Sequence, residues 1–483
     1  MACEQVQAQA PHVVFLAFPT QGHIIPAIQF SNTLASEGFI VTFMCAEQRI
    51  AKIRKSQGAE LNPSIRLIGL PDNVPLGELR IDEGADSFLL SLRIADNMAP
   101  AFEQTVNGLI KDSKESHVPP PLCIISDFFV SWSQDIANKF QIPRYVFYTS
   151  PASHLTLVLY LPRLLEQGIV PVAPDARGIV IPGRPPLDGS EMPWDWQQSS
   201  PKEVNEFSFR NQLRLHESSG ILINTFYELE GEAIDALRTE AINPNKVPIY
   251  PLGPILPSWF LKGEPINDEA FPDQTGNECM QWLDAQAPSS VLYVSFGSVA
   301  IPTIRQIQEI ARGLDASQQA FLWILRLPPS ATEATDLPEG FLSRTHSRGL
   351  IISTWAPQLL ILSHPSTGGF MSHCGWNSIL ESICSGVPIL ALPQFAEQFL
   401  NSRLVAEQLR VGLKLQRGTD DVAESDEIEI AVRELIQGEE GRAMKKRARA
   451  LKEEAARVVA EGGSSHTTLN AFVQAATTTH AQT

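Results

Sequence analysis

The chain has 483 residues, of which 43% are hydrophobic and 19% are charged. This composition is typical of a globular protein, and the length exceeds what one hydrophobic core of ordinary size accommodates. The 37 Lys and Arg residues and the 54 Asp and Glu residues give a net charge of −17, which argues against a nucleic-acid partner because a phosphate backbone would be repelled.

The cysteines and the hydropathy of the chain indicate in which cellular compartment the protein is expected. The six cysteines are scattered without any Cys-x-x-Cys pair, which argues against a disulfide framework and against a zinc site. The first residues show no basic segment followed by an apolar stretch, and no run of about 18 apolar residues occurs. We therefore expect a cytoplasmic protein without a membrane span, and we expect a monomer.

The first half of the chain has the pattern of a buried parallel sheet. Residues 12–18 form an apolar run that predicts a strand, residues 25–37 have helical periodicity, and residues 40–44 predict the next strand. Short apolar strands that alternate with helices are typical of sheets covered on both faces. The same apolar pattern recurs at residues 122–125, 145–148 and 220–224.

The pattern breaks between residues 250 and 275, where Pro, Gly and Asp accumulate, and then begins again. The second half predicts a helix at residues 303–317 and strands at residues 291–295, 321–325, 350–353 and 389–392. We predict an α/β protein in which two Rossmann-like domains face each other across a cleft. The predicted parts are an N-terminal domain at residues 1–252, a linker at 253–276, a C-terminal domain at 277–461, and a helix and tail at 462–483.

A glycine turn before a helix forms a candidate anion site in the second half. After the apolar residues 370–372, the sequence HCG predicts a tight turn, and residues 376–385 predict a helix. Backbone N–H groups at the start of this helix, at Asn377 and Ser378, would point at a bound phosphate.

Three further residues fit a nucleotide at this helix. Gly375 has no side chain to block close approach, and His373 could add a hydrogen-bond donor. Glu381 lies four residues beyond Asn377 on the same helical face, where a carboxylate suits a pair of ribose hydroxyls. The alternative is an ordinary capped helix with a satisfied histidine, and these residues alone do not decide between the two interpretations.

His23 and Asp127 are candidate catalytic residues because each follows a predicted strand. His23 lies at the start of the first helix, within PTQGHIIP, and Asp127 follows the strand in LCIISD. A carboxylate beside a histidine base would fix its tautomer and stabilise the imidazolium. Thr149 and Ser298 also follow predicted strands. The alternatives are a structural histidine, an aspartate that caps the next helix, and ordinary turns.

Residues 355–398, WAPQLLILSHPSTGGFMSHCGWNSILESICSGVPILALPQFAEQ, resemble the plant secondary product glycosyltransferase box of the family-1 UDP-glycosyltransferases. The resemblance continues through residues 279–298, 337–350 and 462–472 and so covers most of the second half. The positions that match in register are Trp355, Ala356, Pro357, Gln358, His373, Gly375, Trp376, Asn377, Ser378, Glu381, Gly386, Pro388 and Gln398.

The resemblance implies a role for each matching position in holding a UDP-sugar. Uracil would stack on Trp355, while the Ala356 backbone and the Gln358 side chain would hold the base and ribose. Glu381 would take the ribose hydroxyls. The residues implied for the diphosphate are Ser298, His373, Asn377 and Ser378, and those implied for the sugar are Trp376, Glu397 and Gln398, with Glu397 standing where Asp is commoner.

The resemblance also implies the catalytic pair and the fold. His23 would be the base, Asp127 its acidic partner, and Thr149 a residue near the sugar, whereas Asp135 is expected to be dispensable. The implied fold is the GT-B arrangement of two Rossmann-like domains. In such proteins the last helix, here within residues 462–483, returns to the first domain.

The implied reaction is an inverting transfer of a sugar from a UDP-sugar to a hydroxyl group of a small lipophilic acceptor. UDP-glucose is the expected donor, and a flavonoid or another phenolic is the favoured acceptor, with terpenoids and hormones as alternatives. The chain contains no Asp-x-Asp triplet, so we expect neither a metal nor another cofactor. A non-catalytic UDP-sugar sensor is the competing function. A dinucleotide-dependent oxidoreductase is disfavoured because no Gly-x-Gly-x-x-Gly motif follows a predicted strand.

The acceptor is expected to bind in the N-terminal half, at residues 82–101 and 182–206. Apolar and aromatic residues interrupt polar loops in these segments, and they could equally be ordinary packing residues. The candidates are Phe88, Leu89, Met192, Trp194 and Trp196.

Overall fold

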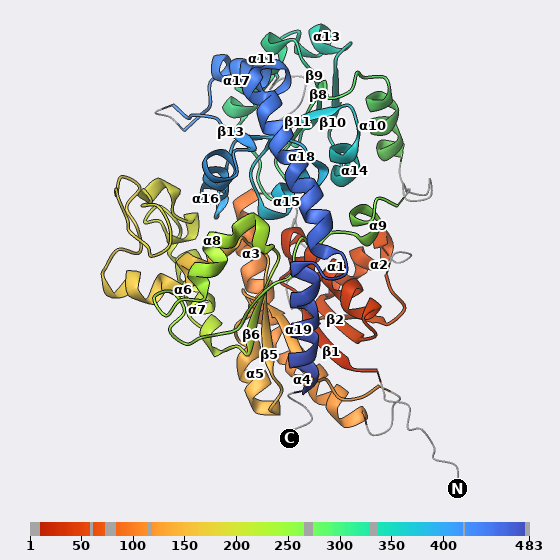
Figure 1. The fold of residues 1–483 in the computed structure, drawn as a ribbon, viewed down its shortest axis with the longest axis vertical. Helices are drawn as coiled ribbons and strands as arrows, with labels where there is room; N and C mark the ends of the chain where they lie inside the picture. The colour runs from red at the N-terminus through yellow and green to blue at the C-terminus, as the bar shows by residue number, and fades with distance from the viewer. Residues whose placement is uncertain are drawn as a thin grey trace.

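The computed structural model describes residues 10–57, 61–72, 84–113, 118–264, 274–327, 337–418 and 421–478. Two parallel sheets, each flanked by helices, form the two halves of the molecule (Figure 1). The predicted α/β class and the pair of Rossmann-like domains are therefore confirmed. Most inner strands of the two sheets are entirely buried, which explains why they are continuous apolar runs in the sequence.

The N-terminal sheet has seven strands in the order β3-β2-β1-β4-β5-β6-β7. The strands are β1 (His12–Leu16), β2 (Ile40–Ala46), β3 (Ile65–Leu70), β4 (Cys123–Asp127), β5 (Arg144–Tyr148), β6 (Gly220–Ile223) and β7 (Ile249–Pro251). The helices of this half are α1 (Gln21–Ser36), α2 (Glu47–Gln57), α3 (Gly84–Asn97), α4 (Ala99–Asp112), α5 (Ser133–Phe140), α6 (Ala152–Glu166), α7 (Lys202–Gln212), α8 (Tyr227–Leu237) and α9 (Ser258–Leu261).

The C-terminal sheet has six strands in the order β10-β9-β8-β11-β12-β13. The strands are β8 (Val291–Ser295), β9 (Ala320–Ile324), β10 (Gly349–Ile352), β11 (Thr367–Ser372), β12 (Ile389–Ala391) and β13 (Gly412–Lys414). The helices of this half are α10 (Gln274–Asp284), α11 (Ile304–Ser317), α13 (Phe341–Thr345), α14 (Gln358–Ser363), α15 (Trp376–Ser385), α16 (Gln398–Arg403), α17 (Ser425–Gln437) and α18 (Glu439–Val459), and the chain continues into α19 (Ser464–Thr478).

The strand order places a topological switch point in each sheet. The first strand of each half lies beside the fourth, so β1 neighbours β4 and β8 neighbours β11. Ligands of open parallel sheets bind at the carboxyl ends of the strands at such points. Residues that follow these four strands are therefore placed to meet a ligand.

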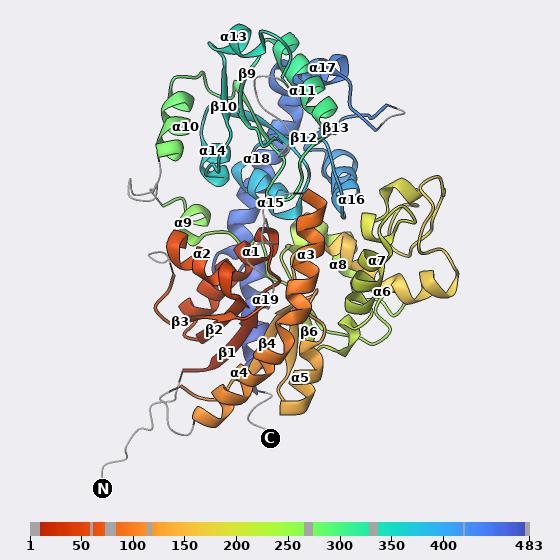
Figure 2. The ribbon, with the colours of Figure 1, turned by 180° about the vertical axis from the view of Figure 1, so that it is seen from behind.

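The chain ends on the first half of the molecule. The long helix α18 leads from the C-terminal half towards the N-terminal half, where α19 lies (Figures 1 and 2). Phe472 of α19 is fully buried, and its ring lies 5.0 Å from that of Tyr145 and 5.8 Å from that of Tyr250. Helix α19 is thus part of the N-terminal core, while residues 479–483 lie outside the described residues.

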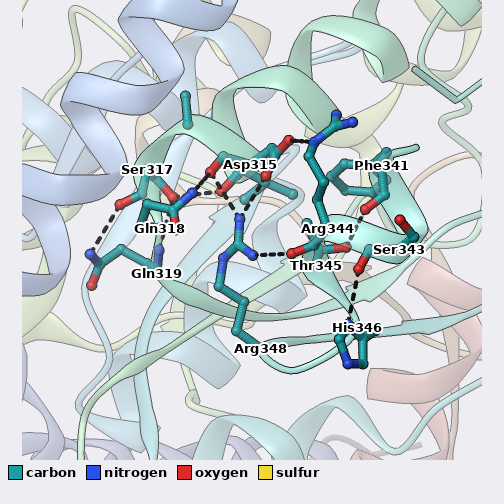
Figure 3. A network of polar contacts seen from close by, with 12 residues as sticks. Asp315, Ser317, Gln318, Gln319, Phe341, Ser343, Arg344, Thr345, His346 and Arg348 are labelled. Atoms are coloured by element: carbon teal, nitrogen blue, oxygen red, sulfur yellow. Dashed lines mark hydrogen bonds and ion pairs between the residues drawn. The ribbon is translucent and has the colours of Figure 1, made fainter. Parts of the chain in front are cut away.

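A polar network holds α11 to α13 and to the start of β10 (Figure 3). Asp315, near the end of α11, accepts hydrogen bonds from Arg344 at 2.6 Å and from Arg348 at 2.7 Å. Arg348 precedes the first residue of β10, so this network lies at the amino end of that strand. It stabilises the edge of the sheet opposite the strand ends that meet a ligand.

The structure departs from the sequence predictions at three short strands and one helix start. Strands β3 and β13 and the edge strand β7 were not predicted; β7 has only three residues and ends in Pro251, a residue that sheets tolerate at edges. Helix α1 begins at Gln21 rather than at residue 25, so Pro26 lies inside the helix and not at its start. Within the predicted linker at 253–276, α9 is formed, and residues 265–273 lie outside the described residues.

Candidate functional site

His23 and Asp127 meet at the switch point of the N-terminal sheet. His23 lies in the first turn of α1, after β1, and Asp127 is the last residue of the neighbouring strand β4. The His23 Nδ1 and Asp127 Oδ2 atoms are 2.6 Å apart, and the aspartate side chain is only 1% exposed. Because a carboxylate can only accept, Nδ1 carries the hydrogen, and Nε2 is the nitrogen left to take a proton.

Asp127 and His23 are each held by a second contact. Asp127 Oδ1 accepts the backbone N–H of Phe129 at 2.9 Å, and Thr149 Oγ1, after β5, lies 3.2 Å from His23 Nδ1. Helix α5 begins only at Ser133, so Asp127 does not cap it, and the alternative interpretation of this aspartate is wrong. The strand ends bring His23, Asp127 and Thr149 together.

An aromatic cluster surrounds the His23 imidazole. The rings of Phe18, Phe128 and Phe129 lie 5.0, 5.6 and 5.6 Å from it. Phe88 of α3 and Phe207 of α7 each lie 6.4 Å from Phe18. Apart from Phe88, these phenylalanines were not singled out in the sequence, because an aromatic residue in an apolar pattern indicates core packing equally well.

Two of the predicted acceptor residues are core residues instead. Met192 and Trp196 are fully buried, and the Trp196 indole N–H donates to Gln212 at 2.8 Å. Trp194 is half-buried, and its backbone N–H donates to the Ala396 carbonyl of the C-terminal half at 3.1 Å. Of the predicted segment 82–101, residues 82–83 lie outside the described residues, and Phe88 and Leu89 are half-buried on α3.

The helix start in the C-terminal half has the geometry of an anion site. Helix α15 begins at Trp376 with Gly375 at its N-cap, and no side chain caps it. The backbone N–H groups of Asn377 and Ser378 therefore lie in the first turn, where no partner within the helix exists. His373 precedes the turn, and its buried Nδ1 atom has no hydrogen-bond partner within the part of the chain that the structure describes.

The His373 ring lies against two glycines, and its pKa favours the neutral form. A Cβ atom added to Gly297 would lie 2.6 Å from the His373 ring, and one added to Gly375 would lie 2.5 Å from its Nε2 atom. Burial, together with the nearby charge of Arg326, lowers the pKa of His373 to about 4. A neutral imidazole can still donate one hydrogen bond to a phosphate oxygen.

Gln358, Ser378 and Glu381 form a cluster on the outer side of α15. The Gln358 amide donates to Glu381 Oε2 at 2.6 Å and to Ser378 Oγ at 2.9 Å. Burial raises the pKa of Glu381 to about 7. Nearby, Ala356 is buried, whereas Trp355 is 62% exposed, an unusual fraction for such a large ring. An exposed tryptophan beside amide and carboxyl groups offers a face on which a base can stack.

The two halves touch where His23 meets α15. The Asn377 amide donates to the carbonyl of Gly22 at 2.6 Å. This carbonyl would ordinarily accept the N–H of residue 26, but Pro26 has none. The proline inside α1 therefore leaves an acceptor free beside His23, and a side chain of the opposite domain occupies it.

Residues predicted to face the sugar lie at the same junction. Glu397 Oε1 lies 3.3 Å from Ser150 Oγ and 3.4 Å from the amide nitrogen of Asn401, and burial raises the pKa of its carboxyl group. The Gln398 side-chain oxygen accepts the backbone N–H groups of residues 394 and 395 at 2.9 and 3.1 Å. The Trp376 ring is buried, and its N–H donates to the Asn224 carbonyl at 2.7 Å, so that N–H is not available to a sugar hydroxyl.

Two kinds of feature are absent from the described residues. None of their helices is long and apolar enough to cross a membrane. No group of three or more His, Cys, Asp or Glu side chains in these ranges is arranged to hold a metal ion.

Comparisons with known proteins agree with this geometry. A family model described as "UDP-glucoronosyl and UDP-glucosyl transferase" matches residues 249–449. UDP-glycosyltransferase 72B1 of Arabidopsis thaliana is 35% identical over 95% of both chains, and 7-deoxyloganetin glucosyltransferase of Gardenia jasminoides is 36% identical over 96% of this chain and 97% of its own. The structure of Phytolacca americana UGT2 complexed with UDP-2fluoro-glucose and pterostilbene superposes with a TM-score of 0.83, at 32% identity, covering 97% of this chain and 100% of that chain.

Proposed function

Because this chain belongs to the plant family-1 UDP-glycosyltransferases and is a glycosyltransferase, we propose that it transfers glucose from UDP-glucose to a hydroxyl group of a small lipophilic acceptor with inversion at the anomeric carbon. One observation carries the proposal. The base candidate His23, paired with Asp127 at 2.6 Å, follows Gly22, whose carbonyl contacts Asn377 at the start of α15. A proton acceptor thus lies against an anion site.

The reaction begins at the acceptor hydroxyl. Its proton passes to Nε2 of His23 while its oxygen attacks the anomeric carbon of the sugar. The bond from that carbon to the UDP oxygen breaks, and the electron pair leaves with UDP. Displacement from the face opposite UDP inverts the anomeric centre, so an α-linked donor gives a β-glucoside. Asp127 stabilises the imidazolium that forms.

The charge on the departing diphosphate is met by fixed dipoles. The backbone N–H groups of Asn377 and Ser378 lie at the positive end of the α15 dipole. His373 donates from Nε2, the ring nitrogen that lies beside Gly297 and Gly375, and the hydroxyl of Ser298 follows β8 at the same edge of the sheet. These groups supply the stabilisation without a divalent cation, so EDTA should leave the rate unchanged.

The remaining donor-box residues recognise the nucleotide and the sugar. Trp355 stacks on uracil, Ala356 and Gln358 hold the base and ribose, and Glu381 accepts from the ribose hydroxyls. Glu397 lies against Ser150 of the N-terminal half, and Gln398 and Thr149 are the chain neighbours of these two residues, near the place where the sugar must sit if its anomeric carbon is to reach the acceptor. Trp376 contributes through its backbone, because its indole N–H is engaged. Glucose is favoured as the sugar because one relative is a glucosyltransferase and the solved structure holds a fluoroglucose donor.

The aromatic cluster around His23 favours an aromatic acceptor. Phe88 is half-buried, and the buried rings of Phe18, Phe129 and Phe207 pack behind it, so the surroundings of His23 offer apolar rings rather than hydrogen-bonding groups. Such a wall binds a flat, apolar ring and leaves orientation to the reacting hydroxyl. We therefore favour a phenolic such as a flavonoid or stilbene; pterostilbene is the second ligand of the similar Phytolacca americana structure.

The test is product formation from purified protein. UDP-glucose, UDP-galactose or UDP-xylose is combined with phenolic, terpenoid and hormone acceptors, with and without EDTA, and products are identified by mass spectrometry and by the anomeric proton coupling in NMR. The proposal predicts a β-glucoside of a phenolic that forms equally in EDTA. UDP binding without transfer to any acceptor would instead support the sensor function.

A further inference from the structure

A guanidinium lies across the loop that follows β8. Arg326 is the second residue after β9, the neighbour of β8 on the side away from β11. Its Nη1 donates to the carbonyl of Ser298 at 2.8 Å, and its Nη2 donates to the carbonyl of Gly297 and, at 3.4 Å, to that of Ala300. One side chain thus holds three of the four carbonyls in the loop 297–300.

This loop has little room to move on its other side. Gly297 has a φ of +72°, and a Cβ atom at this position would lie 2.6 Å from the His373 ring. The loop is therefore clamped between Arg326 and His373, two residues from different strands of the sheet. A clamp of this kind fixes the direction of the Ser298 hydroxyl and backbone before any ligand arrives, which is how preorganised sites avoid an ordering cost.

Arg326 also brings a full positive charge to this edge. His373 is neutral because its pKa is lowered to about 4, in part by Arg326 itself, so the histidine adds no charge towards a diphosphate. Asn377 and Ser378 offer dipoles only. A guanidinium cannot lose its proton in the physiological range, so the charge is permanent.

We propose that Arg326 is a positioning residue of the donor site, which shapes the loop 297–300 for the diphosphate. The inference rests on the proposed function, since the diphosphate of a UDP-sugar is the ligand of the loop. It concerns the phosphates, because Arg326 donates to the loop 297–300, whereas Trp355, Gln358 and Glu381 are assigned to the base and ribose.

The experiment compares UDP with uridine, which shares the base and ribose but has no phosphate. Dissociation constants are measured by calorimetry, or by NMR for the weaker ligand, in the natural protein and in Arg326→Gln and Arg326→Lys. Arg326→Gln should weaken UDP binding by about tenfold or more and change uridine binding by less than about twofold. Arg326→Lys keeps the charge without the planar fork, so its affinity for UDP should lie between that of the natural protein and that of Arg326→Gln.

Arg348→Lys is the matched control. Arg348 is likewise a half-buried arginine of this sheet, and it donates to the carbonyls of Arg344 and Asp315 (Figure 3), but it lies at the amino end of β10. This change should lower the Tm and leave the ratio of the two dissociation constants unchanged.

Two results would overturn the inference. One is an Arg326→Gln variant whose UDP affinity equals that of the natural protein. The other is an equal loss of affinity for UDP and uridine, because that would show a general loss of structure. If the natural protein binds no UDP at all, the proposed function fails and this inference fails with it, an outcome that the measurement on the natural protein alone identifies.

Discussion

The hydrogen bond between His23 and Asp127 decides which nitrogen of the imidazole can act. With Nδ1 held at 2.6 Å from the carboxylate, the proton-accepting Nε2 is left for the acceptor. Thr149 lies 3.2 Å from the same Nδ1 and so limits rotation of the ring. The pair is set among phenylalanine rings, where its electrostatic interaction is screened less than in water.

Asp127→Asn should lower the rate of glucose transfer by at least about a hundredfold. The amide keeps the shape of the carboxyl group, but it can donate to Nδ1 and favour the wrong tautomer, and it no longer balances the imidazolium. The rate constant of transfer is measured at saturating donor, and the UDP dissociation constant is expected to stay within about twofold because Asp127 is held by the N-terminal half.

Asp135→Asn is the control for that variant. Asp135 lies on the next helix and forms an exposed pair with Arg214 at 2.7 Å. Exposed pairs contribute about 1 kcal/mol or less, so the Tm should fall slightly and the rate should be unchanged. A rate loss in Asp135→Asn as large as that in Asp127→Asn would remove the special role given to Asp127.

We expect the affinity for UDP-glucose to depend on pH because of Glu381. Its pKa is raised by burial to about 7, so the folded protein holds this proton up to neutral pH, whereas the unfolded chain releases it earlier. A ribose hydroxyl donates to the ionised carboxylate, so the affinity for UDP-glucose should rise between about pH 6 and pH 8. UDP-glucose is the correct probe because it has no terminal phosphate that titrates in this range.

Glu381→Gln should abolish this pH dependence. His373, with a pKa of about 4, stays neutral throughout the range and adds no slope. Because the folded protein binds this proton more tightly than the unfolded chain does, Glu381 also contributes to stability at acidic pH. This contribution is lost as the pH rises through about 7. An affinity for UDP-glucose that is flat with pH in the natural protein would contradict the assignment of Glu381 to the ribose.

Helix α1 contacts the C-terminal half through a backbone carbonyl that has no partner within the helix. Because Pro26 has no N–H group, the Gly22 carbonyl has no partner within α1, and it accepts a hydrogen bond from the Asn377 amide of α15. The residue after Gly22 is His23, so this contact sets the distance between the base and the diphosphate site. The proline thus has a function in the assembly of the site, although prolines inside helices ordinarily only reduce stability.

Pro26→Ala should lower the rate of transfer by about two- to tenfold, the value of one hydrogen bond, while UDP binding stays the same. The alanine N–H offers the Gly22 carbonyl a partner within α1, which competes with Asn377. Pro162→Ala is the control, because Pro162 lies exposed inside α6. Equal effects of the two changes on the rate would contradict the role given to Pro26.

At the level of the assembled domains, α19 makes the two halves interdependent. The C-terminal half ends in α18, and the chain then buries Phe472 in the N-terminal core beside Phe30, Tyr145 and Tyr250. The end of the chain is therefore part of the domain that begins it. Closure around a ligand must accommodate this fixed connection.

Phe472→Ala should reduce the free energy of unfolding by about 3–5 kcal/mol, the usual cost of removing a fully buried ring. Chemical denaturation measures the change, and truncation after Glu461 should impair folding further. The exposed residue Gln474 on the same helix gives the control, since Gln474→Ala should alter the free energy by less than about 0.5 kcal/mol. A truncated protein with unchanged stability and turnover would contradict this role of α19.

The sequence predicts the residues at strand ends better than it predicts their neighbours. His23, Asp127 and Thr149 follow apolar runs, and parallel strands bring such positions to one edge of a sheet. Contacts between distant elements have no local signal. The fork of Arg326 on the loop 297–300 and the hydrogen bond between Trp376 and Asn224 depend on how strands and domains pack, and nothing within a few residues of either position indicates them.

Short edge elements were missed for a different reason. Strand β13 has only three residues, and β3 is half-exposed along most of its length, so neither forms a clear apolar run. The burial of Trp196 and Met192 likewise could not be distinguished from exposure in a binding site, because both environments favour large apolar side chains.

The most direct test of the division of work between the halves is single-turnover transfer by His23→Ala, measured together with its affinity for UDP-glucose. We expect the transfer rate to fall by about 10²–10⁴-fold while the dissociation constant for UDP-glucose changes by less than about twofold. A variant that transfers glucose at the natural rate, or one that loses donor affinity as strongly as it loses rate, would contradict the assignment of His23 as the base.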